Sequence, residues 1–166
     1  MKPIKIFSIL LMLCLGIATA ATAQPAAVKK AANTTFTLTT FDAKGSILST
    51  SNGVFVSNNG ICVSTWKPFV GAMKAEVTDN NGQKYSVETI LGANELYDVA
   101  KFKITAKTNA ALFAPSVVAN SAAWIVMPSQ AGAPIKANID KVEKFMTKYN
   151  YCVLSTTASE KYNGAP

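Results

Sequence analysis

The sequence predicts an all-β protein built as two halves. Short runs rich in Thr, Val, Ile and Phe recur about every ten residues, as in small β domains. The clearest separators are residues 58–60 (Asn-Asn-Gly) and 79–82 (Asp-Asn-Asn-Gly), both typical of tight β-hairpins. No long amphipathic helical pattern is present. These observations together favour a small antiparallel barrel.

The first half contains six expected strands, each an alternating or apolar run bounded by turn residues. A polar and then alanine-rich connection follows at residues 105–114, and the strand pattern after it is less regular. The first half is therefore expected over residues 35–106 and the second over residues 107–166. The expected strands are residues 35–41, 54–57, 61–64, 75–78, 84–91, 99–104, 122–127, 139–145 and 151–156.

The N-terminus has the pattern of a secretory signal peptide. Lys2 and Lys5 precede an apolar run over residues 6–17, and two Ala-x-Ala motifs end at Ala20 and Ala23. The apolar run is too short to span a bilayer comfortably. We expect a signal peptide over residues 1–23, a flexible N-terminal lead over residues 24–34, and a mature protein in the periplasm or outside the cell. No integral membrane span is expected in the mature chain.

The charged residues exclude several kinds of partner. All 16 cationic residues are lysine, and 9 residues are acidic. Cleavage of the signal peptide removes two lysines and lowers the formal net charge from +7 to +5. Without arginine, which reads phosphates and base edges best, a nucleic-acid site is not expected. The chain also has no histidine and no Cys-x-x-Cys motif, so neither a metal centre nor a cofactor is expected.

Two cysteines, Cys62 and Cys152, remain after the expected export. An even number of cysteines in an oxidising compartment permits a disulfide, which here would join the two halves. The alternative is a pair of separately buried thiols. The sequence leaves both open.

Residues 51–72 resemble the hairpin that carries the catalytic histidine in trypsin-like serine proteases of the Do/HtrA type. In that family a Gly-x-Gly-Phe hairpin leads to Thr-x-x-His and then to Gly-Ala. Here Ser-Asn-Gly-Val-Phe leads to Ser-Thr-Trp-Lys and then to Gly-Ala. Residues 95–104 are similar to the family's Asp-Leu-Ala-Leu-Leu-Lys-Ile motif, and residues 122–126 to the strand that opens its second barrel. The resemblance covers residues 35–166 and implies a trypsin-like double β-barrel.

The resemblance also implies where the catalytic triad would lie. Such proteases use a serine nucleophile, a histidine base and an aspartate that orients the base. The histidine position is Lys67, the aspartate position is Asp98, and the serine position is Asn163, in Lys-Tyr-Asn-Gly-Ala-Pro against the family's Gly-Asn-Ser-Gly-Gly-Pro. An asparagine amide is not a nucleophile, and no imidazole is present to activate one. No triad is intact, and an ion pair between Lys67 and Asp98 is expected in its place.

Proteases of this fold continue beyond the Gly-Gly-Pro turn, whereas this sequence stops at Pro166. The second barrel is therefore expected to be incomplete at the C-terminus, and the chain to be a fragment or a degenerate short form. The leading hypothesis is an exported, non-catalytic protease homologue that binds extended peptide or protein segments by strand addition. The alternatives are an active secreted serine endopeptidase whose triad is misaligned here, and a β-rich envelope or adhesion protein.

Overall fold

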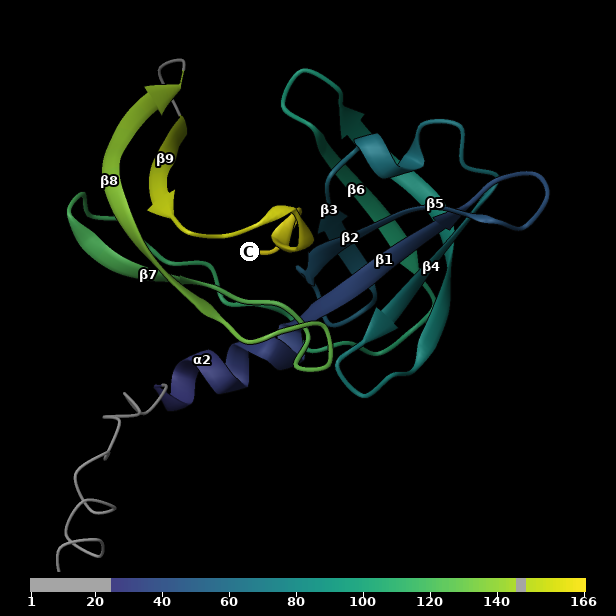
Figure 1. Cartoon of the computed structure of the whole chain (residues 1–166), viewed down its shortest axis with the longest axis horizontal. Helices are drawn as coiled ribbons and strands as arrows, with labels where there is room; N and C mark the ends of the chain where they lie inside the picture. The colour runs from purple at the N-terminus through teal and green to yellow at the C-terminus, as the bar shows by residue number, and fades with distance from the viewer. Residues whose placement is uncertain (1–24, 146–148) are drawn as a thin grey trace, which may run out of the picture.

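The computed structural model describes residues 25–145 and 149–166. The expected signal peptide, with its cleavage sites at Ala20 and Ala23, lies outside these residues. The described chain is mostly β and forms a closed six-stranded barrel beside a separate three-stranded sheet (Figure 1). The predicted all-β class is confirmed.

The barrel is formed entirely by antiparallel pairs in the order β1-β2-β3-β6-β5-β4, and β4 pairs back with β1 to close it. Because the sheet closes on itself, its backbone edges are paired within the barrel. The strands are β1 (Thr35–Phe41), β2 (Ile47–Phe55), β3 (Ile61–Ser64), β4 (Lys74–Asp79), β5 (Lys84–Asn94) and β6 (Val99–Ile104).

Three phenylalanine side chains form the centre of the barrel core. The ring of Phe36 lies 4.8 Å from that of Phe55 and 5.9 Å from that of Phe102, between ring centroids. Leu38, Val77 and other alternating residues of the strands complete the cluster. Gly53 leaves room for this packing, because a Cβ at this position would lie 2.3 Å from the Phe36 ring. The hairpin that resembles the protease motif is thereby fixed against the core.

Strand β2 begins earlier than the sequence predicts. The expected strand covered residues 54–57, whereas β2 starts at Ile47 and ends at Phe55. Its first half is rich in Ser and Thr and largely exposed, so hydrophobic periodicity does not reveal it. Pairing with β1 extends this segment, since each residue from Ser49 to Val54 has a partner on β1.

The second half is an open antiparallel sheet in the order β7-β8-β9. Its strands are β7 (Ser121–Ile125), β8 (Ile135–Phe145) and β9 (Tyr149–Thr156). Figure 1 shows this curved sheet standing apart from the barrel, with the C-terminal residues between the two. A closed barrel followed by a partial second sheet matches the predicted double barrel with an incomplete second half.

Residues 26–34, which were expected to be part of a flexible lead, are helical and packed. Helix α2 (Ala26–Ala31) continues into the 3-10 turn η1 (Ala32–Thr34). Val28 and Ala32 are buried in a cluster with Val126 of the second half. Alanine favours helix, and burial of Val28 supplies the packing that so short a helix needs. Within the described residues, no helix is both long enough and apolar enough to cross a membrane.

The two cysteines lie in different sheets and do not form the disulfide that the sequence permits. Cys62 in β3 is buried and Cys152 in β9 is exposed, and both are free thiols. The Sγ atom of Cys62 donates to the carbonyl of Gly60 at 3.6 Å. Burial raises the pKa of the Cys62 thiol to about 12. Cys62 therefore behaves as a small core residue.

Candidate functional site

The candidate site begins where β3 leads into the 3-10 turn η2 (Lys67–Phe69). Pro68 suits the first turn of a helix because it lacks the backbone N–H that would have no partner there. The rings of Trp66 and Phe69 stack with centroids 6.1 Å apart, and Phe69 meets Phe102 edge-on at 5.2 Å. These aromatic contacts fix η2, and with it Lys67, at one end of the barrel core.

Asp98 lies opposite η2, in the turn between β5 and β6. Its Oδ1 atom accepts the backbone N–H of Trp66 at 2.9 Å and that of Lys67 at 2.7 Å. Its φ of 50° is in the left-handed region, which Asp and Asn adopt more readily than most residues. The carboxylate thus joins the turn before β6 to the end of β3.

The expected ion pair between Lys67 and Asp98 is absent from the described part of the chain. The Lys67 side chain is exposed, and Asp98 contacts Lys67 through the backbone N–H. Two main-chain donors already satisfy the carboxylate oxygen, and a long lysine side chain keeps its hydration at an exposed position. The sequence therefore predicted correctly that Lys67 and Asp98 are neighbours, but they interact through the backbone N–H of Lys67 and not through its side chain.

Asn163 lies in the turn that follows η3 (Glu160–Tyr162). Its backbone N–H donates to the carbonyl of Glu160 at 2.9 Å, and its side chain is exposed. Asn163 has φ −54° and ψ 129°, and Gly164 has φ 73°. With the N–H of Ala165 bonded to the carbonyl of Tyr162 at 2.9 Å, these angles describe a type II turn.

Asn52 of β2 holds this turn against the barrel, and sequence reasoning did not single it out. Its backbone N–H donates to the carbonyl of Asn163 at 2.8 Å, and its side-chain Nδ2 donates to the carbonyls of Lys161 at 2.8 Å and Asn163 at 3.1 Å. The Ser64 hydroxyl donates to the carbonyl of Asn52 at 2.5 Å. Asn52 is 3% exposed in β2, and because the expected strand began only at residue 54, no sequence signal marked it as a buried amide.

Hydrogen bonds join two of the predicted site residues, Lys67 and Asp98, directly, and attach the third, Asn163, to strand β2. Asp98 binds the backbone at Lys67, and Asn163 binds Asn52, which Ser64 links to the end of β3. Among the described residues, no hydrogen bond joins the side chains of Lys67 and Asn163. The nearby Ser64 hydroxyl is buried and donates to the carbonyl of Asn52, and the chain has no histidine that could activate it.

Comparison with known proteins supports the fold. No family model matches the sequence, and no curated protein matches it. Among solved structures, the HtrA-type protease AlgW, determined with a tripeptide, is similar with a TM-score of 0.69 and 18% sequence identity. The chain has the fold of trypsin-like, HtrA-type proteases. The match covers 84% of this chain and 48% of the AlgW chain, so this chain spans about half of the length of that protease.

Proposed function

We propose that this chain is an exported, non-catalytic protein of the trypsin-like protease fold that binds extended peptide or protein segments. In this proposal Lys67, Asp98 and Asn163 occupy the positions of the histidine, aspartate and serine of a catalytic triad. The observation that carries it is Asp98, whose carboxylate still organises the main chain at residues 66 and 67 while the side chain at position 67 is lysine.

The turn at residues 162–165, which holds Asn163 at the position of the serine nucleophile in this proposal, gives independent support. A serine protease must stabilise a developing oxyanion with backbone N–H donors beside its nucleophile. Here the N–H of Asn163 donates to the carbonyl of Glu160, so it is not available to a substrate. In this proposal the base and the nucleophile are missing, and the N–H donor of residue 163 is engaged. Because the parts of such a mechanism act as a unit, restoring one of them alone would not restore activity.

Labelling with a fluorophosphonate probe tests the non-catalytic state. Serine hydrolases form a covalent adduct at an activated serine, and here we expect none, with an active trypsin-like protease as the positive control. Intact mass spectrometry of the folded protein gives the readout. An adduct on any serine of this chain would show that a nucleophile is activated and would establish the alternative of an active endopeptidase.

Export rests on the N-terminal sequence. Lys2, Lys5, the apolar run and the Ala-x-Ala motifs support a cleaved signal peptide. Expression with the natural N-terminus in a secreting host is expected to yield mature protein that begins at Ala21 or Gln24. N-terminal sequencing of the product provides the measurement, and a product that keeps Met1 and stays in the cytoplasm would refute export.

Peptide binding is the function that the fold can retain without its chemistry. Extended peptides bind by adding hydrogen bonds to an unpaired backbone segment, which requires no nucleophile. The similar AlgW structure contains a tripeptide, and this supports peptide as the ligand class. The test is saturable binding of synthetic peptides to the folded protein, followed by fluorescence anisotropy.

A further inference from the structure

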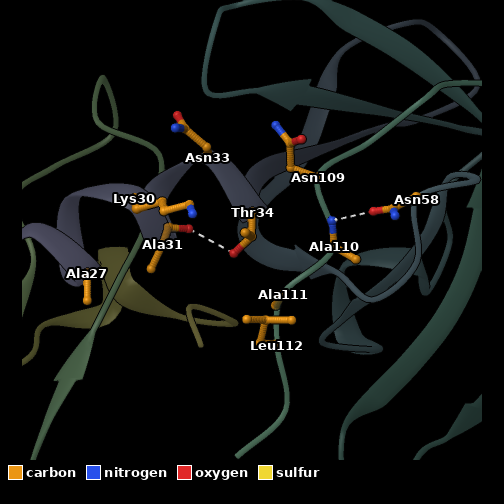
Figure 2. Close-up of a pocket in the computed structure, with 10 residues that line it drawn as sticks. All are labelled: Ala27, Lys30, Ala31, Asn33, Thr34, Asn58, Asn109, Ala110, Ala111 and Leu112. Atoms are coloured by element: carbon orange, nitrogen blue, oxygen red, sulfur yellow. Dashed lines mark hydrogen bonds between the residues drawn. The ribbon is translucent and has the colours of Figure 1, made fainter.

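A hollow of about 710 Å³ lies between helix α2 with η1 on one side and the connection from Asn109 to Leu112 on the other (Figure 2). We propose that this hollow binds an extended peptide with small or aliphatic side chains and a free carboxylate. The proposal rests on the peptide-binding function above and assigns it a place outside the candidate site at residues 67, 98 and 163. Its size is in the range of ligand pockets in proteins.

The hollow is lined by small apolar side chains together with polar ones. Alanine side chains at residues 27, 31, 110 and 111 leave space for the ligand's own side chains. Leu112 is 97% exposed at the hollow and the next residue, Phe113, is 77% exposed. Such exposed apolar side chains beside a hollow favour a partner that covers them.

The connecting segment has unused backbone groups, as strand addition requires. The N–H groups of Ala110 and Ala111 donate to the Asn58 side chain at 3.0 Å and to the carbonyl of Phe55 at 2.8 Å, which attaches the segment to the barrel. Within the described residues, the N–H groups of Asn109 and Leu112 have no hydrogen-bond partner. An extended peptide beside this segment would supply partners for such groups.

The polar groups of the lining present donors, which favours an acceptor-rich ligand. Asn33 uses its Oδ1 to accept from Asn80 at 2.7 Å, and Asn58 uses its Oδ1 to accept from Ala110. The Nδ2 groups of both asparagines therefore remain free to donate. Among the described residues that line the hollow, Lys30 is the charged one and none is acidic. A carboxylate matches this arrangement in both charge and hydrogen bonding.

The test uses a pool of fluorescein-labelled pentapeptides made of Ala, Val and Leu, prepared once with free C-terminal carboxylates and once amidated. We expect the free-acid pool to bind saturably, and Lys30→Ala to weaken binding by about tenfold, the effect of losing one hydrogen bond to a charged group. Ala111→Trp fills the hollow and is expected to weaken binding at least as much. The matched controls are Lys29→Ala, on the same helix but outside the lining, and Ala43→Trp, in an exposed turn.

The outcomes separate the site from the function. If the amidated pool binds as well as the free-acid pool, or if Lys30→Ala equals Lys29→Ala, the carboxylate recognition is wrong. If Ala111→Trp and Lys30→Ala both bind like the wild type, the peptide site lies elsewhere and the proposed function stands. If no peptide of either pool binds, the hollow is not a site for peptides of this kind, and the proposed function is then decided by its own test with peptides of other sequences. Circular dichroism confirms that each variant is folded before binding is compared.

Discussion

The carboxylate of Asp98 accepts the backbone N–H groups of Trp66 and Lys67, so its contribution to stability comes through the main chain. Asp98→Ala would leave two donors without their acceptor and place alanine at a left-handed φ. We expect the free energy of unfolding to fall by about 2–3 kcal/mol. Asp98→Asn keeps an acceptor oxygen and a residue that tolerates this φ, so its loss should be smaller.

Urea denaturation of these variants provides the measurement, with Lys67→Ala as the matched control. The Lys67 side chain is exposed and has no ion pair with Asp98 in the described chain, so its removal should change stability by no more than about 0.5 kcal/mol. Equal losses in Asp98→Ala and Lys67→Ala would contradict the main-chain role and indicate a charge pair.

Asn52 is the second residue whose role depends on particular atoms. Its Nδ2 donates to the carbonyls of Lys161 and Asn163. Asn52→Asp replaces this donor with an acceptor that faces two carbonyl oxygens, and we expect a loss of about 2–3 kcal/mol. Backbone amides of residues 159–166 should also exchange faster in hydrogen-exchange mass spectrometry. Asn81→Asp, in an exposed hairpin turn, is the control, and a similar effect there would refute the role of Asn52.

The two thiols should differ in reactivity and in their effect on stability. Cys152 is exposed and should react with Ellman's reagent in the folded protein, whereas buried Cys62 should react only on unfolding. Because burial raises the pKa of Cys62 from 9.0 to about 12, the unfolded chain loses this proton first as the pH rises. The Cys62 contribution to stability is therefore intact below pH 9.0 and lost between there and about pH 12.

Stability measured against pH in the wild type and in Cys62→Ala tests that contribution. The wild type should lose more stability than Cys62→Ala across this alkaline range, while the two profiles run parallel at neutral pH. Fast reaction of both thiols in the native state would contradict the burial of Cys62.

At the scale of elements, the strands with the strongest patterns were predicted best. The expected limits of β1, β3 and β6 coincide with the observed ones, because their alternating residues and, for β3, the preceding Asn-Gly turn determine both. The first half of β2 was missed because its polar, exposed residues carry no periodic signal. The bond from Asp98 to the backbone was also missed, because a sequence motif identifies neighbouring residues but not the atoms through which they interact.

Helix α2 is the element for which local sequence was most misleading. Short alanine-rich segments are unstable alone, and α2 gains its stability from Val28, which packs with Ala32 and Val126. Val28→Asp places a charge in this cluster and should lower the free energy of unfolding by at least about 2 kcal/mol. Thermal unfolding gives the measurement, and Lys29→Asp, exposed on the same helix, is the control. A flexible lead, as first expected, would make both changes equally neutral.

At the scale of the whole molecule, the contact between the barrel and the C-terminal turn tests whether side-chain changes alone could create a reactive serine. The double variant Lys67→His with Asn163→Ser supplies an imidazole near Asp98 and a hydroxyl in the turn. We nevertheless expect no fluorophosphonate labelling, because the N–H of residue 163 is engaged by Glu160 and Asn52 holds the turn in this conformation. Loss of one oxyanion donor alone costs about a hundred- to a thousandfold in rate.

The single variants Lys67→His and Asn163→Ser are the controls for this experiment, and intact mass spectrometry detects the adduct. Labelling of the double variant, but of neither single variant, would show that the turn can rearrange to admit a substrate. In that case the side chains at positions 67 and 163 alone would decide whether a serine in this turn is activated. If no variant is labelled, the expectation is met that the hydrogen bonds from Asn52 to Lys161 and Asn163 hold the turn in a conformation that two side-chain changes do not make reactive.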